Sequence, residues 1–195
     1  MEPFILTASG KRIDLLHPEP DMFCVEDIAT SLDRLCRFTG HCRRFYSVAE
    51  HSWRGASFLD GELGREFLLH DAHEAYVGDL STPLKQQCDA YRWISEKIDA
   101  AIRVRFGLPE TMSPQCKQMD LQMLATEKRD LMPEDPIPWP SLKGIDAFPI
   151  DLKHDQKSPW GDFIRSRLEE SQLWYVPPCD LESSLPQTSF CKESV

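Results

Sequence analysis

One row of side chains constrains the fold of this chain more than any other feature. Between residues 62 and 77, apolar and ionisable residues recur with spacings of four, three, four and three, at Leu63, Phe67, His70, Glu74 and Val77. This spacing places all five on one face of an α-helix. Such a face would bury an imidazole and a carboxylate between apolar side chains, and burying either group without a partner costs several kcal/mol. A metal ion beside the helix would offset that cost.

Similar spacing of apolar residues predicts further helices over about 25–37, 46–59, 89–106, 114–131 and 159–168. Ser113-Pro114 supplies an N-cap and a first-turn proline for the helix that follows it, and Ser158-Pro159 does the same for the last helix. Gly107 and Pro109 end the helix before them.

The N-terminal segment differs from the rest. Residues 4–8 and 12–16 flank Ser9-Gly10-Lys11, a pattern that predicts a short β-hairpin. The proline-rich stretch over 133–149 is expected to be a loop. We therefore predict an all-α fold, a helical bundle with a short N-terminal β-hairpin.

The length of 195 residues suits one domain, which we place at residues 1–175, followed by a flexible tail over 176–195. Hydrophobic residues make up 41% of the chain and charged residues 28%, which is typical of a globular protein rather than a disordered one. No run of 18 apolar residues occurs, and the N-terminus lacks the basic and apolar regions of a signal peptide. These features predict a cytoplasmic protein that does not bind membranes.

Seven cysteines are present, an odd number without a Cys-x-x-Cys pair. A disulfide framework or a zinc ribbon would show an even count or paired spacing. Reduced thiols that act as small core side chains are the better interpretation.

The net charge of −10 argues against binding to a nucleic-acid polymer, whose affinity comes mainly from neutralised phosphates. A basic cluster runs against this balance and contains Arg34, Arg37, His41, Arg43 and Arg44. Such a cluster suits a compact anion such as a nucleotide phosphate. The alternative is that these side chains pair with surface carboxylates.

Four residues are candidate metal ligands: His51, His70, Asp71 and Asp120. Imidazole nitrogen and carboxylate oxygen without thiolate favour one divalent ion of Mn, Fe, Co, Ni or Zn. Four protein ligands in an octahedral shell would leave two positions for water and substrate. On spacing alone, ordinary core or surface histidines are an equally good interpretation.

Three motifs carry a resemblance to a known family. They are Ala-Glu-His-Ser at 49–52, Leu-Leu-His-Asp-Ala-His-Glu-Ala-Tyr-Val-Gly-Asp-Leu-Ser-Thr-Pro-Leu-Lys at 68–85, and Asp120 with Ala125-Thr126-Glu127. Together they resemble the HD-domain phosphohydrolase superfamily, and within it the 5′-deoxynucleotidase branch with its prophage and phage relatives. The resemblance runs from about Ile13 to Leu131.

The resemblance implies a role for each matching residue. His51, His70, Asp71 and Asp120 would hold the ion, and Glu74 would handle the proton of the attacking water. Asp79 would support that water or the substrate. The substrate-binding residues would be Arg37, Phe38, His41, Arg43 and Lys85, with the ring at position 38 helping to exclude a 2′-hydroxyl.

Two positions depart from the family pattern. Phe38 stands where tryptophan is common in the better-known deoxynucleotidases, and His73 stands where serine or threonine is frequent. His73 could support a metal ligand, contact a nucleobase or simply be exposed, and exposure is the favoured interpretation.

The expected activity is hydrolysis of the 5′-phosphate ester of a deoxynucleotide. The products would be a deoxynucleoside with phosphate from a monophosphate, or with triphosphate from a triphosphate, as in the phage dATP triphosphohydrolases. The alternatives are a non-catalytic nucleotide-binding sensor and another HD phosphodiesterase. By analogy with the family, a homo-oligomer is expected.

Overall fold

The computed structural model describes residues 3–154 together with Ile164 and Ser166. The predicted tail over 176–195 lies outside the described residues. So does the predicted helix over 159–168, apart from those two positions.

A small antiparallel sheet opens the chain. Strand β1 (Phe4–Leu6) pairs with β2 (Arg12–Asp14), and Ile5 lies opposite Ile13. The turn between them includes Gly10 at φ 86°, a conformation that glycine adopts without a steric penalty. Ile13 is fully buried in the main core. The predicted hairpin is therefore confirmed, with strands shorter than expected.

The rest of the described chain is mostly helical, as predicted. The α-helices are α1 (Val25–Arg34), α2 (Val48–Ala56), α3 (Gly61–Leu68), α4 (Glu74–Val77), α5 (Thr82–Lys85), α6 (Asp89–Phe106) and α7 (Pro114–Leu131). Three short 3₁₀ turns are η1 (Pro20–Met22), η2 (Arg37–Gly40) and η3 (Pro140–Leu142). No described helix has the length and apolar character needed to cross a bilayer.

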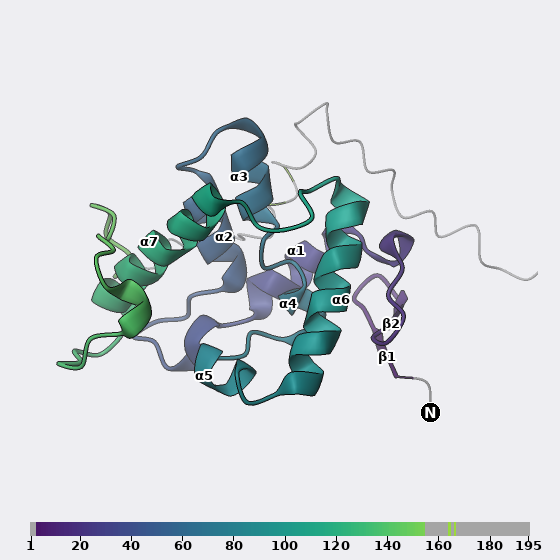
Figure 1. Cartoon of the computed structure of the whole chain (residues 1–195), viewed down its shortest axis with the longest axis horizontal. Helices are drawn as coiled ribbons and strands as arrows, with labels where there is room; N and C mark the ends of the chain where they lie inside the picture. The colour runs from purple at the N-terminus through teal and green to yellow at the C-terminus, as the bar shows by residue number, and fades with distance from the viewer. Residues whose placement is uncertain (1–2, 155–163, 165, 167–195) are drawn as a thin grey trace, which may run out of the picture.

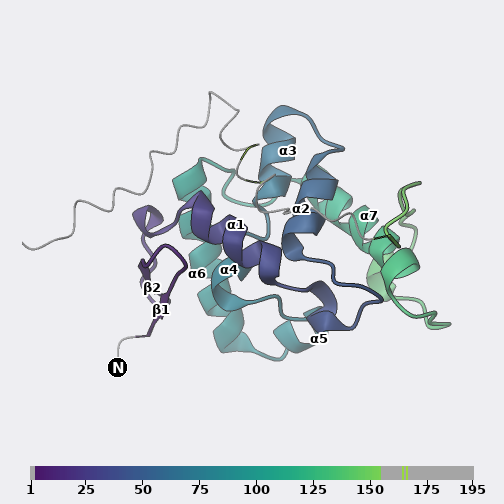
Figure 2. The same ribbon diagram turned by 180° about the vertical axis from the view of Figure 1, so that it is seen from behind.

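Helix α2 packs against α1, α3 and α7, while α4 packs against α1 and α6 (Figure 1). The hairpin lies beside α6, at the opposite end of the molecule from residues 132–154, which follow α7 (Figures 1 and 2). Lys97 on α6 donates to the carbonyl of Leu16 at 2.8 Å, which ties the helix to the segment after the hairpin. Phe23, Phe67, Ile98, Ile102 and Met123 are among the core side chains shared by these elements.

The predicted helix over 62–77 is wrong in one respect, because it is interrupted. Helix α3 ends at Leu68 and α4 begins at Glu74. Between them the amides of His70, Ala72 and Glu74 donate to carbonyls three residues earlier, at 3.3, 3.0 and 2.9 Å. This tighter winding still buries His70 and Glu74, so the predicted row remains inward although the α-helix does not continue.

Two other predicted helices are shorter than expected. Helix α1 ends at Arg34 rather than at 37, so Arg37 lies in η2. Helix α2 begins at Val48 because Ser47 caps it, its side chain accepting from the amide of Glu50 at 3.0 Å.

Residues 132–154, which follow α7, have little regular structure but are tied back to that helix. The Thr126 hydroxyl accepts from the amide of Phe148 at 2.9 Å, and the Asp130 carboxylate accepts from the amide of Leu152 at 3.0 Å. Asp130 also forms an ion pair with Arg129 at 2.7 Å.

Candidate metal centre

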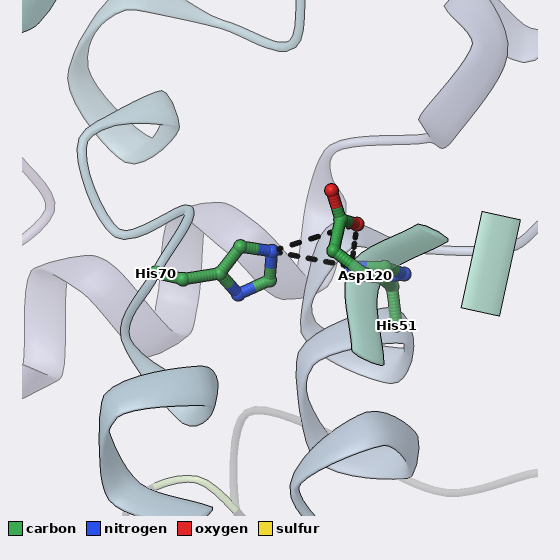
Figure 3. A group of neighbouring side chains, drawn as sticks. All are labelled: His51, His70 and Asp120. Carbon is green, nitrogen blue, oxygen red and sulfur yellow. Dashed lines mark hydrogen bonds and ion pairs between the residues drawn. The ribbon is translucent and has the colours of Figure 1, made fainter. Parts of the chain in front are cut away.

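The candidate ligands come from three separate elements. His51 lies in the middle of α2, His70 and Asp71 lie in the tight turn between α3 and α4, and Asp120 lies in α7. The side chains of His51, His70 and Asp120 point toward one another (Figure 3). One ligand atom from each of these three lies within 4.8 Å of the others, an arrangement that could hold a metal ion.

The distances agree with a single ion. His51 Nε2 lies 3.3 Å from His70 Nε2 and 3.3 Å from Asp120 Oδ1, and His70 Nε2 lies 3.9 Å from Asp120 Oδ1. Asp71 Oδ2 lies 3.1 Å from His70 Nε2 and 3.9 Å from His51 Nε2. Atoms bound to one ion at about 2.1 Å lie roughly 3.0 to 4.2 Å apart, for angles between about 90° and 180°. All five distances fall in that range.

The other nitrogen of each imidazole has a hydrogen-bond acceptor. His51 Nδ1 lies 2.6 Å from Glu127 Oε1, and His70 Nδ1 lies 2.6 Å from the carbonyl oxygen of Phe67. We therefore assign the proton to Nδ1 in both rings. In neutral rings the two Nε2 lone pairs then face each other at 3.3 Å. Either a proton on one Nε2 or a metal ion bound to both relieves the repulsion between two lone pairs at this distance.

The site is closed on the imidazole side and open on the carboxylate side. The exposed fraction of the side chain is 0% for His51 and 1% for His70, but 17% for Asp71 and 39% for Asp120. An ion would therefore enter past the two aspartates.

The charges around the site favour a cation. Burial and the Arg37 charge oppose protonation of His51, but the Glu127 and Asp120 carboxylates outweigh them and raise its pKa to about 9. Although burial opposes ionisation of Asp71, the neighbouring His70, His51 and Arg37 hold its pKa well below the usual range.

Arg37, expected to bind substrate, is buried among the carboxylates. Its Nη1 lies 3.4 Å from Asp71 Oδ2 and its Nη2 lies 3.2 Å from Glu127 Oε2. The Nε atom has no hydrogen-bond partner among the described residues. Arg37 is thus held between two carboxylates of the site, and its Nε–H is left for another acceptor.

Phe38 has a left-handed backbone, with φ 57° and ψ 29°, and Thr39 follows with φ 55°. Such conformations cost roughly 1–3 kcal/mol in a residue that is not glycine, and they occur mostly where function requires them. The half-buried Phe38 ring lies between Arg37, whose guanidinium is 5.5 Å from its centroid, and Trp139, at 6.5 Å between ring centroids.

Glu74 and Lys85 lie together. Lys85 Nζ is 3.6 Å from Glu74 Oε1, while Glu74 Oε2 is buried without a hydrogen-bond partner among the described residues. Burial and the charges of Asp71 and Asp79 raise the pKa of Glu74 well above its usual range. Burial likewise raises the pKa of Asp79, which is half-buried.

The side chains of the basic cluster at 34–44 do not converge on a common anion-binding position. His41 and Arg43 are exposed. Arg44 makes two hydrogen bonds to the buried Glu50 carboxylate, at 2.9 and 2.7 Å, and therefore anchors the loop to α2. His73, one of the departures from the family pattern, is largely buried, with its Nδ1 3.9 Å from Asp99.

Two features of this region were not predicted. Glu127, quoted within a motif but given no role, is fully buried against His51. It follows Asp120 by two helical turns, so the spacing along α7 would have indicated a shared face. Cys36 and Cys42, treated as scattered thiols, have sulfur atoms 3.7 Å apart and flank the turn that carries Arg37 and Phe38.

Fold and site together define a helical protein with a candidate metal centre of two histidines and neighbouring aspartates. The chain is 46% identical to the uncharacterized protein YfdR of Escherichia coli strain K12 over 144 residues, which cover 74% of this chain and 81% of YfdR. The chain therefore belongs to the same family as YfdR. It is also 38% identical to an uncharacterized protein of Rhodobacter capsulatus over 120 residues, covering 56% of this chain and 61% of that protein. No protein-family model matches the chain.

Proposed function

We propose that this protein is a metal-dependent phosphohydrolase of the HD-domain superfamily that hydrolyses the 5′-phosphate ester of deoxynucleotides. One observation carries the proposal: two buried imidazoles direct their Nε2 atoms at each other, 3.3 Å apart, beside the Asp71 and Asp120 carboxylates. The motif resemblance supplies the substrate class.

His51, His70, Asp71 and Asp120 would hold one divalent ion. Their nitrogen and oxygen donors fit Mn²⁺, Co²⁺, Zn²⁺, Fe²⁺ or Ni²⁺. When bound, such an ion supplies Lewis-acid chemistry to a phosphoryl oxygen and to water.

Glu74 would move the proton. Its raised pKa suits a carboxyl group that takes up a proton in one step and returns it in another, since proton transfer is most efficient near the working pH. The unpartnered Oε2 leaves one oxygen for this purpose. Asp79 would orient the water or substrate from the end of the same segment.

Lys85 and Arg37 would bind charge on the phosphate. Lys85 is 32% exposed and 3.6 Å from Glu74, so its ammonium group can meet a phosphoryl oxygen at the mouth of the site. Arg37 would offer its remaining Nε–H, while Phe38 would pack against the sugar and exclude a 2′-hydroxyl.

A substrate screen tests this proposal. Purified, metal-replete protein is incubated with dAMP, dATP, AMP and ATP, and phosphate is resolved from triphosphate by ion-exchange chromatography. We expect release from a deoxynucleotide to exceed release from its ribonucleotide, and the released product identifies the monophosphate or the triphosphate as substrate. Nucleotide binding without any turnover would contradict the proposal and favour a sensor.

A further inference from the structure

Glu127 lies behind the candidate metal centre and touches no open surface. Its side chain is fully buried, and one oxygen lies 2.6 Å from His51 Nδ1. The other oxygen lies 3.2 Å from Arg37 Nη2. Arg37 in turn contacts Asp71. Glu127 and Arg37 therefore connect two candidate ligands, His51 and Asp71, through buried contacts.

A carboxylate behind a ligating imidazole has two effects. It accepts the Nδ1 proton, which leaves the Nε2 lone pair for the ion, and it increases the basicity of the ring. A carboxylate buried for structure alone needs only a counterion. Here the contact with the imidazole is shorter than the contact with the guanidinium, 2.6 against 3.2 Å.

We propose that Glu127 is a positioning residue that fixes His51 with its proton on Nδ1 and thereby sets the metal affinity of the site. This inference rests on the metal centre of the proposed function. Glu127 Oε1 accepts from His51 Nδ1, while Oε2 lies 3.2 Å from Arg37 Nη2 as an ion pair and accepts no hydrogen bond among the described residues. Glu127→Gln removes the negative charge that faces both groups, and its single acceptor oxygen meets His51 in only one of the two amide orientations.

The experiment compares metal affinity in the full chain. Zn²⁺ and Mn²⁺ binding is measured by competition with a chromophoric chelator for wild type, Glu127→Gln and a matched control, Glu66→Gln. Glu66 is also a buried glutamate, but it accepts from the amide of Ser113 at the start of α7. We expect Glu127→Gln to bind the metal roughly 10–100-fold more weakly, and Glu66→Gln to bind it as wild type does. Equal affinity of Glu127→Gln and wild type would overturn the inference.

A second measurement needs no variant that might fail to fold. Long-range ¹H–¹⁵N spectra of the Zn²⁺-loaded wild type should show His51 protonated at Nδ1 and coordinated through Nε2. Coordination through Nδ1 would overturn the inference. A protein that binds Zn²⁺ in this way but hydrolyses no deoxynucleotide would contradict the proposed activity and leave the role of Glu127 intact. A protein that binds neither ion would overturn both.

Discussion

Gly55 lies so close to Phe67 that a Cβ added at residue 55 would fall 2.1 Å from Cε1 of the ring. This contact is where α2 and α3 meet. The Phe67 ring also stacks on the His70 ring, with 4.3 Å between centroids, and the Phe67 carbonyl accepts from His70 Nδ1. The absence of a side chain at residue 55 therefore determines where His70 lies.

A Gly55→Ala variant should lose both stability and metal affinity. Its methyl group must displace the Phe67 ring, and such overpacking costs roughly 1–3 kcal/mol in the free energy of unfolding. Urea denaturation measures the first effect and chelator competition the second. Ala56→Gly is the matched control, because it removes a buried methyl group and weakens the same helix, at a combined cost of roughly 1–2 kcal/mol, without pressing on the ring. Unchanged metal affinity in Gly55→Ala would show that the Phe67 ring does not position His70.

Removal of metal should lower the melting temperature. An ion that binds only the folded chain stabilises it by about 2.7 kcal/mol at a free concentration 100 times its Kd. Thermal unfolding with and without chelator measures this shift. A His70→Ala variant serves as the control and should melt at the same temperature in both conditions. A wild-type melting temperature that ignores the chelator would contradict a metal centre.

Glu74→Gln should abolish most activity but keep the metal. Loss of a general acid–base group lowers turnover by about 10²–10⁴-fold. Among the described residues Glu74 forms its ion pair with Lys85, and none with His51 or His70. Turnover and chelator competition are measured on the same preparation. Full turnover in the variant would remove Glu74 from the proposed proton transfer.

Phe38→Gly should reduce the preference of the enzyme for deoxyribose over ribose. The substitution removes the ring and relieves the left-handed backbone at φ 57°. We expect the ratio of kcat/KM for deoxynucleotide over ribonucleotide to fall, with no loss of folding stability beyond that of the ring contacts. Thr39→Gly relieves the same kind of backbone strain at φ 55° without touching the ring, so its ratio should match wild type. An equal fall in both variants would assign the effect to the backbone.

Acid should weaken the attachment of the segment around Leu152 to α7. The Arg129 side chain, and to a smaller extent the amide of Leu152, outweigh burial and lower the pKa of Asp130 below its usual value. A lowered pKa gives stability that is complete above the unfolded value, near 3.8, and is lost as pH falls through the folded value. Asp130→Asn should therefore be less stable than wild type at pH 7, by about 1–3 kcal/mol. Urea midpoints measured from pH 7 to pH 2.5 should converge, and a gap that stays constant would contradict this assignment.

The long helices were predictable because several local features agree. In α6 the apolar spacing ends at Gly107, which adopts the left-handed conformation of a C-cap. Ser113, one residue before Pro114, caps α7: its side chain accepts from the amide of Cys116, as the Ser-Pro pair indicates. The break at Leu69 was not predictable from spacing. The turn that follows, in which amides donate to carbonyls three residues earlier, keeps nearly the same side chains facing inward as an α-helix would.

The candidate site was predictable to a lesser degree. Spacing alone left its histidines ambiguous, and the motif resemblance singled them out together with Asp120; the structure brings these three side chains together. The involvement of Arg37 with Asp71 and Glu127 depends on the left-handed turn of η2, which no residue preference at Phe38 or Thr39 indicates. The role of Glu127 could not be assigned from the sequence, because its partner, His51, lies on another helix 76 residues away.

Because the site is built from three separate elements, it can form only late in the folding of the chain. His51 and His70 are separated by 19 residues, and Asp120 joins them only when α7 has docked against α2 and α3. Closing such long loops carries an entropic cost that short fragments of the chain cannot recover. We expect no isolated piece of the chain to capture the ion. Separation of α7 from its neighbours would remove Asp120 from the ion, so a bound ion should slow the unfolding of the native state.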